Sequence, residues 1–199
     1  CALESFRESE EIPGGEFSIG LWVGSSTSPN RNNDAVKALK ELNKNNDKLK
    51  NNPFLIDRCP WCAAEMGPKK INNNCYSEGY VEINKSVIFK CTDHECDYNE
   101  HLPLYIIDEE IYKKKPSLVI GTVDKFAMLA WNENIRSLFG FNDRGERELS
   151  PPKLIIQDEL HLISGPLGTV TGAVEAVFDV LLKHFGAKPK YIAATATIR

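Results

Sequence analysis

The segment from Lys153 to Gly168 constrains the fold of this chain most, because it joins a short apolar run to an acidic pair. Leu154 to Gln157 have the length and character of a buried strand, and Asp158 and Glu159 follow at once. A strand that is apolar on both faces is typical of a covered, usually parallel, sheet. Ligands of such sheets gather at the carboxyl ends of the strands. The sequence therefore predicts a parallel α/β sheet with an acidic site at its edge.

Two adjacent carboxylates at a strand end suit a magnesium nucleotide. Asp158 can hold the ion directly or through water, and Glu159 can orient or deprotonate the attacking water. The alternative is that both residues merely open a surface loop or cap a helix. A second predicted strand, Tyr191 to Ala194, also ends in small or polar residues, Thr195, Ala196 and Thr197.

The tetrapeptide Asp158, Glu159, Leu160 and His161 resembles the DExH box, which is the Walker B motif of superfamily 2 helicases and translocases. In that family a Ser/Thr-Ala-Thr motif ends a later parallel strand, as Thr195-Ala196-Thr197 does here. The resemblance implies a first RecA-like domain in which Asp158 binds Mg²⁺ and Glu159 activates water for ATP hydrolysis. It also implies that four further residues couple the nucleotide site to nucleic acid: His161, Thr195, Ala196 and Thr197.

Two more strands end in small or hydroxyl-bearing residues. The apolar run 17–23 is followed by a turn that contains Ser25, and the run 117–120 is followed by Gly121 and Thr122. An ordinary strand-to-helix loop explains the first turn at least as well as a binding role does. Gly121, Thr122 and Lys125 stand at a predicted helix start, where a phosphate can bind. The resemblance implies instead that these turns are the Ia and Ib regions, which bind the nucleic-acid backbone through Ser25, Gly121, Thr122 and Lys125. All four strand ends are expected to converge at one edge of the sheet.

The intervening segments are predicted as helices and loops. Periodicity and capping residues predict helices over 34–49, 108–115 and 169–184, with a turn over 164–168 before the last. A further helix is expected to begin at Thr122 and to bury one apolar stripe, formed by Val123, Phe126, Ala127, Ala130 and Trp131. The acidic residues 1–15 are interpreted as a loop or lead-in. Residues 132–152 are mostly polar, and an exposed loop is predicted over 141–152.

Four cysteines form the second strong pattern. Cys59 and Cys62 lie in one close pair, and Cys91 and Cys96 lie in another. Two close thiol pairs separated by a longer span are typical of a zinc ribbon, in which four thiolates surround a structural Zn²⁺. A disulfide framework is the poorer explanation because intracellular thiols stay reduced. Between the pairs, residues 80–83 and 86–90 are predicted as a hairpin.

The sequence does not decide which residues of the second pair bind the zinc ion. Its two cysteines are separated by four residues rather than two, so His94 is able to replace Cys96. Cys75 and His101 are the other candidate ligands. A site closed by four ligands would be structural, and no catalysis is expected there.

Composition and charge limit the class of protein. The chain has 199 residues, 42% of them hydrophobic, which is typical of a globular protein with one core and a small satellite unit. No run of apolar residues is long enough for a membrane span, and no signal segment opens the chain, so a cytoplasmic location is expected. The formal net charge of -4 does not exclude nucleic acid, because motor ATPases contact phosphates through local groups.

Two elements of the helicase pattern are missing from these residues. No G-x-x-x-x-G-K-[ST] phosphate loop is present, and no second RecA-like domain follows. The chain is therefore interpreted as a piece of a longer protein and is expected to be inactive alone. The predicted parts are residues 1–52 and 102–199 of a partial RecA-like domain, with a zinc ribbon inserted over 53–101. A sheet without its phosphate-loop strand would expose an interior edge, so we expect either a rearranged sheet or a contact between copies that covers this edge.

Three longer segments carry a narrower resemblance: QDELHLISGPLGT, GTVDKF and the CPWC pair. Together they resemble the DrmA family, the large helicase-like subunit of DISARM antiphage systems. This resemblance implies nucleic acid as a partner, with DNA favoured over RNA, and other subunits of a defence complex. Two other functions are considered: a zinc-ribbon module that binds nucleic acid or protein on an α/β scaffold, and a metal-dependent nuclease that uses Asp158, Glu159 and His161.

Overall fold

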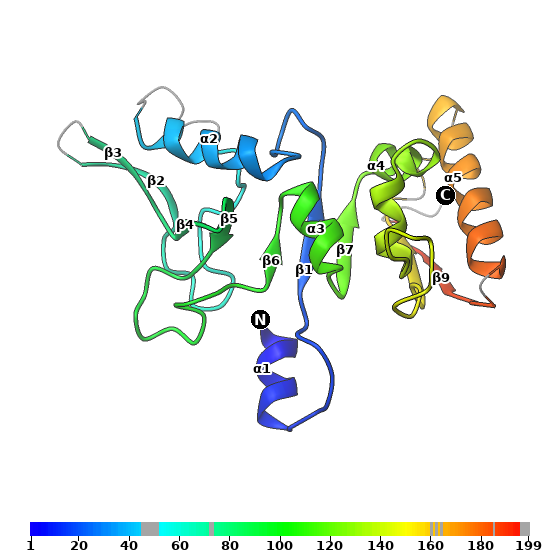
Figure 1. Cartoon of the computed structure of the whole chain (residues 1–199), viewed down its shortest axis with the longest axis horizontal. Helices are drawn as coiled ribbons and strands as arrows, with labels where there is room; N and C mark the ends of the chain where they lie inside the picture. The colour runs from blue at the N-terminus through cyan, green and yellow to red at the C-terminus, as the bar shows by residue number, and fades with distance from the viewer. Residues whose placement is uncertain are drawn as a thin grey trace. The chain divides into compact units, whose positions relative to one another are not determined.

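The chain folds as a mixed α/β protein, which confirms the predicted fold class (Figure 1). This computed structural model describes residues 1–44, 52–71, 74–159, 161, 163, 165–184 and 186–195. The chain divides into two compact units, Cys1–Ile120 and Gly121–Arg199. Among the helices described, none is both long enough and apolar enough to cross a bilayer.

The first unit is built on a three-stranded sheet with the order β6-β1-β7. The central strand β1 (Ile19–Trp22) pairs in parallel with β6 (Leu104–Tyr105), and β7 (Leu118–Gly121) lies on its other side. Trp22 is fully buried and meets the ring of Tyr112 edge to face. Tyr112 belongs to α3 (Asp108–Lys114), the helix predicted over 108–115, and this ring contact packs the helix against the sheet.

The prediction of a loop over residues 1–15 is wrong, because α1 (Ala2–Ser9) is a helix. Its Glu4 side chain is buried and accepts hydrogen bonds from the Arg7 guanidinium and from the backbone N–H of Phe17. The Arg7 hydrogen bond is the main reason that the pKa of Glu4 is lowered to about 2. The hydrogen bond between Glu4 and Phe17 holds the helix against the following loop, and no local sequence pattern predicts it.

The second helix, α2 (Asn32–Leu42), begins two residues before the predicted start at Asp34. The reason is a cap from another element: the backbone N–H of Asn32 donates to a carboxylate oxygen of Glu109 at 2.8 Å. A carboxylate satisfies a free N–H of the first turn and interacts well with the helix dipole. The predicted continuation over residues 45–49 lies outside the described residues.

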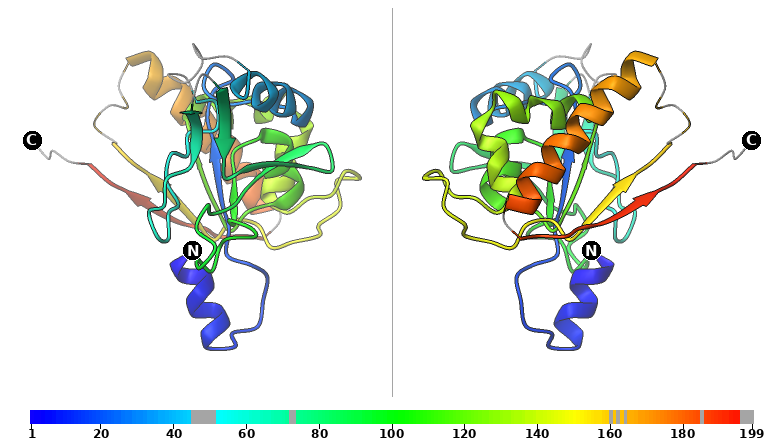
Figure 2. Two further views of the ribbon diagram at one scale, coloured as in Figure 1. Left: turned by 90° about the vertical axis from the view of Figure 1, so that its left-hand side faces the viewer. Right: turned by 90° about the vertical axis from the view of Figure 1, so that its right-hand side faces the viewer.

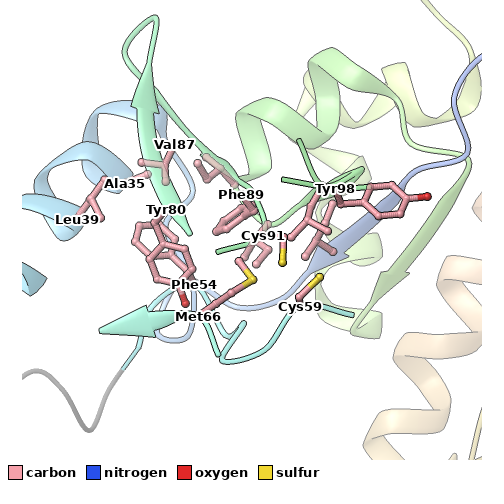
Figure 3. Close-up of a cluster of buried hydrophobic side chains, with 14 of the residues drawn as sticks. Ala35, Leu39, Phe54, Cys59, Met66, Tyr80, Val87, Phe89, Cys91 and Tyr98 are labelled. Carbon is pink, nitrogen blue, oxygen red and sulfur yellow. The ribbon is translucent and has the colours of Figure 1, made fainter. Parts of the chain in front are cut away.

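The ribbon region consists of two antiparallel hairpins. The predicted hairpin is confirmed as β4 (Tyr80–Ile83) and β5 (Ser86–Phe89). The second hairpin, β2 (Gly67–Ile71) and β3 (Asn74–Glu78), was not predicted. The β4–β5 hairpin, α2 and three of the cysteines, Cys59, Cys91 and Cys96, share one buried cluster, shown in part in Figure 3. Its centre is a set of rings packed edge to face, Phe54, Tyr80 and Phe89.

The second unit contains the DELH segment. Strands β8 (Leu154–Gln157) and β9 (Lys190–Ala193) form a two-stranded parallel sheet and lie side by side in Figure 2. Helix α4 (Val123–Ala127) contacts the long helix α5 (Gly165–His184). Phe178 of α5 packs against the rings of Phe126 and Phe139.

Two predictions for this unit are wrong, and one is confirmed. Helix α5 begins at Gly165 rather than Thr169, because a proline is tolerated in the first turn of a helix. The loop predicted over 141–152 is confirmed, and the residues before it form a 3₁₀ helix, Glu133–Phe139, whose apolar residues Ile135 and Phe139 are buried. The predicted apolar stripe also fails at its end, since Trp131 is 71% exposed.

Strand β8 was expected to be buried on both faces, but one of its faces is exposed to solvent. Leu154 and Ile156 of β8 are 49% and 57% exposed, and their neighbour on β9, Ile192, is 42% exposed. Leu118 and Ile120 of β7, in the first unit, are exposed to a similar degree. The strand character of both segments was predicted correctly, but their complete burial was not.

Candidate functional site

The DELH and Thr-Ala-Thr segments follow neighbouring strands. Gln157, the last residue of β8, is the register partner of Ala193, and Ala194 continues the ladder by donating its N–H to the Gln157 carbonyl at 2.8 Å. Because the strands are parallel, both segments leave the sheet at the same end. The acidic pair and Thr195 therefore lie side by side, as the sequence predicts.

His161 joins the two segments. Its Nδ1 lies 3.2 Å from a carboxylate oxygen of Glu159 and 3.1 Å from Oγ1 of Thr195. A single ring nitrogen is thus within reach of the predicted base and of the neighbouring strand's hydroxyl. Glu159 has a φ of 52°, which few residues other than glycine adopt without strain, and such strain is common at functional sites. Any movement of the Glu159 carboxylate can therefore be passed to Thr195 through one side chain.

Asp158 is arranged differently from Glu159. Its Oδ1 accepts the backbone N–H of Glu159 at 2.9 Å, which shapes the turn after β8 and leaves the side chain exposed. In the described part of the chain, Asp158, Glu159 and His161 do not form a cluster with metal-ligand spacing. Magnesium in nucleotide sites usually takes only one or two carboxylates and completes its shell with phosphates and water. The magnesium-nucleotide and nuclease interpretations of this acidic pair both stay predictions.

One contact behind the acidic pair was missed. The Gln157 side-chain amide donates to the Glu175 carboxylate of α5, which ties the end of β8 to this helix. The sequence offers no direct signal for this pair. The only hint was the single polar residue, Gln157, at the end of an otherwise apolar strand.

The predicted nucleic-acid contacts fall in both units. Ser25 is exposed in a turn of the first unit that is closed by a hydrogen bond from the N–H of Thr27 to the Gly24 carbonyl. In the second unit, Thr122 is exposed at the start of α4, but the Lys125 side chain is buried. The convergence of these residues with the acidic pair stays a prediction. Ala196 and Thr197 lie outside the described residues.

The four predicted zinc ligands come together in the first unit. The sulfur atoms of Cys59, Cys62, Cys91 and Cys96 all lie within 4.8 Å of one another. The Cys62–Cys91 and Cys59–Cys96 sulfurs are separated by 3.4 Å and 4.0 Å. A tetrahedral zinc ion with bonds of about 2.3 Å to sulfur sets these separations at about 3.8 Å. The cluster could therefore hold zinc, and both pairs are much too far apart for a disulfide bond.

The surrounding backbone builds this cluster from two tight turns. Cys59 accepts the N–H of Ala63 and donates its own to Ala64, while the N–H of Cys91 donates to the Tyr98 carbonyl. Burial raises the pKa of the Cys91 and Cys96 thiols, whereas a backbone hydrogen bond from Ala64 lowers that of Cys62. Buried neutral thiols are costly to ionise unless a cation shares their charge. A bound divalent ion would supply that charge.

The alternative ligands do not join the cluster. His94 is exposed on the second turn, and its carbonyl accepts the Asn99 side-chain amide at 2.6 Å. His101 lies 3.7 Å from the Glu16 carboxylate, and Cys75 lies in the hairpin strand β3. Among the residues that the structure describes, the candidate metal group consists of the four cysteines alone.

A comparison with known proteins gives one informative match. The chain is 39% identical to the DISARM protein DrmA of Bacillus paralicheniformis, over an alignment 220 positions long. The match covers 92% of this chain but only 19% of the length of that relative. No protein-family model matches the chain. The chain is thus similar, over nearly all of its length, to about a fifth of a DISARM protein DrmA, and the resemblance seen in its motifs is confirmed.

Proposed function

We propose that this chain is part of the first RecA-like domain of an ATP-dependent nucleic-acid translocase or helicase that serves in antiphage defence. The observation that carries the proposal is the junction of β8 and β9, where His161 contacts both Glu159 and Thr195. The similarity to a DISARM protein supports the defence role. In this proposal, residues 53–101 are a zinc ribbon inserted between two parts of the RecA-like domain.

Each residue of the junction has a proposed role. Asp158 binds Mg²⁺ that carries ATP, and Glu159 orients and deprotonates the attacking water. His161 senses the state of Glu159 and transmits it to Thr195 and to the following residues, Ala196 and Thr197. The polynucleotide, which we expect to be DNA, contacts Ser25, Gly121 and Thr122 through its phosphates. Lys125 was grouped with these residues, but its burial argues for a structural role.

The isolated chain is not expected to hydrolyse ATP. The sequence contains no Walker A loop to hold the β- and γ-phosphates, and it contains no second RecA-like domain to complete the site. Activity therefore belongs to the longer protein, in which the missing groups are supplied by other segments.

The test is a substitution in the full-length protein. Glu159→Gln keeps the size and polarity of the side chain but removes the base, so DNA-stimulated ATP hydrolysis should fall by about 10²- to 10⁴-fold while ATP binding is retained. Glu133→Gln is the matched control, because Glu133 is an exposed glutamate of the same unit that has no role in the proposed site. Phosphate release and equilibrium binding of a fluorescent ATP analogue measure the two effects.

A second function is supported by the cysteine cluster. A zinc ribbon that binds nucleic acid or protein needs the four thiolates but not the acidic pair. In that case Glu159→Gln would leave the full-length protein with its normal ATPase rate, and deletion of residues 57–100 would abolish binding of its partner. That pair of results would replace the motor proposal with the binding-module alternative.

A further inference from the structure

A cavity of about 250 Å³ lies within the first unit, between the hairpin strand β5 and the sheet strand β6. Consecutive residues of both segments line it, Val87 to Phe89 on one side and Leu104 to Ile107 on the other. Successive side chains of a strand point to opposite faces. A cavity lined by consecutive residues is therefore bordered by strand edges, which means that it occupies a gap between two strands.

Both ends of this gap are closed by hydrogen bonds. At one end the N–H of Leu102 donates to the Phe89 carbonyl at 2.8 Å. At the other end Asn32 links the two sides, because it accepts from the Ser86 hydroxyl and donates to Glu110, both at 2.8 Å. The gap is thus too short for an added strand, but it can accept a single inserted side chain from outside.

The size of the cavity also favours a side chain over a cofactor. Sites for small molecules usually measure about 300–1,000 Å³, which is larger than this cavity. Interface anchors, in contrast, are single large side chains, often tryptophan or tyrosine, buried in well-packed pockets. Val87, Phe89 and Ile106 make the floor apolar, and all three are buried.

The charge at the mouth selects the partner. Lys114 lines the cavity and is exposed, and it makes no ion pair or hydrogen bond with the described residues. Lys113 precedes it at the basic end of α3. Glu110 also lines the cavity and keeps its negative charge, and its carboxylate accepts a hydrogen bond from the Asn32 amide. Lys113 and Lys114 together outweigh this single negative charge, so the mouth is complementary to an aromatic residue flanked by acidic ones.

From this geometry we propose that the cavity between β5 and β6 is a docking site for an acidic segment of a partner protein, which inserts one large aromatic side chain. The aromatic ring fills the gap between the strands, and a flanking carboxylate pairs with Lys114. The proposal concerns the first unit only and does not depend on ATP hydrolysis by the second.

The test uses NMR of the whole chain with two synthetic peptides of defined sequence. Asp-Glu-Trp-Asp-Glu should shift the amide signals of Ile88, Tyr105 and Lys114 in a saturable way, whereas Asp-Glu-Ala-Asp-Glu should bind about tenfold more weakly. Lys114→Glu should weaken binding of the tryptophan peptide, while Lys113→Glu, at a lysine that does not line the cavity, should weaken it less. Ile88→Trp, which fills the cavity from within, should abolish binding.

Three results would overturn the proposal. The two peptides could bind equally, or the shifted amides could lie away from the cavity. The third is that a short oligothymidine shifts the same amides while neither peptide does, which would assign Lys114 to nucleic-acid phosphates. Should Ile88→Trp fail to fold, the comparison of Lys114→Glu with Lys113→Glu still decides the matter, because both changes are on the surface of α3.

Discussion

Cys91 shows what a single residue contributes to the candidate metal centre. Its thiol is buried, its sulfur lies 3.4 Å from that of Cys62, and its backbone N–H is held by the Tyr98 carbonyl. Without a cation, a cluster of four thiols, three of them buried, makes only weak hydrogen bonds. With zinc it would become a crosslink between two turns that are distant in the sequence.

We therefore expect one zinc ion per chain, lost on Cys91→Ser. The same change should lower the melting temperature clearly, because metal binding and folding of a ribbon are coupled. Cys75→Ser is the matched control: it removes a thiol from the same region but outside the cluster, so zinc content should stay unchanged. Elemental analysis of both purified variants measures the metal. Equal zinc content in the two would contradict the assignment of ligands.

At the scale of elements, backbone geometry decides how the β2–β3 hairpin connects to the β4–β5 hairpin. Gly79 joins β3 to β4 with a φ of 78°, and a Cβ atom built on it would lie 2.8 Å from the Lys90 carbonyl oxygen and 2.7 Å from the Met66 side chain. Gly145 has a similar φ of 75°, but a Cβ atom there meets nothing within 4 Å. A side chain at either position strains the backbone, but only a side chain at Gly79 also clashes with its neighbours. Comparing the two positions therefore separates the free-energy cost of strain from that of a clash.

Gly79→Ala should destabilise the chain by roughly 2–4 kcal/mol, since strain and overpacking add. Gly145→Ala should cost only about 1 kcal/mol, because strain acts alone. Chemical denaturation of the two variants, with the wild type beside them, gives both values. Equal destabilisation would show that the neighbours of Gly79 yield without cost.

Local signals explain which elements could be predicted. The strands β7, β8 and β9, the helix α3 and the hairpin β4–β5 follow from short apolar runs and turn residues, and the cysteine spacing predicted the metal cluster. The start of α2 and the helix α1 could not be predicted, because Glu109 and Phe17 supply their partners from elsewhere in the chain. The contact of His161 with Thr195 rests on the pairing of β8 with β9, which the family resemblance predicted and composition alone did not.

At the scale of the whole molecule, the open face of the β8–β9 sheet is the feature with the largest consequence. Ile156 and Ile192 are register partners and share one face, and Leu154 lies on the same face two residues away. All three are between 42% and 57% exposed. Exposed apolar surface on a two-stranded sheet with free edges favours pairing with another chain.

We therefore expect the isolated chain to self-associate, with a mean mass that rises with concentration in sedimentation velocity experiments. Ile156→Glu places a charge in the centre of the open face and should shift the chain to the monomer, because pairing would bury an unpaired carboxylate. Leu149→Glu is the control, since Leu149 is 48% exposed but lies outside the strands, and it should leave association unchanged. A wild-type chain that stays monomeric at all concentrations would mean that this face is covered by the chain itself.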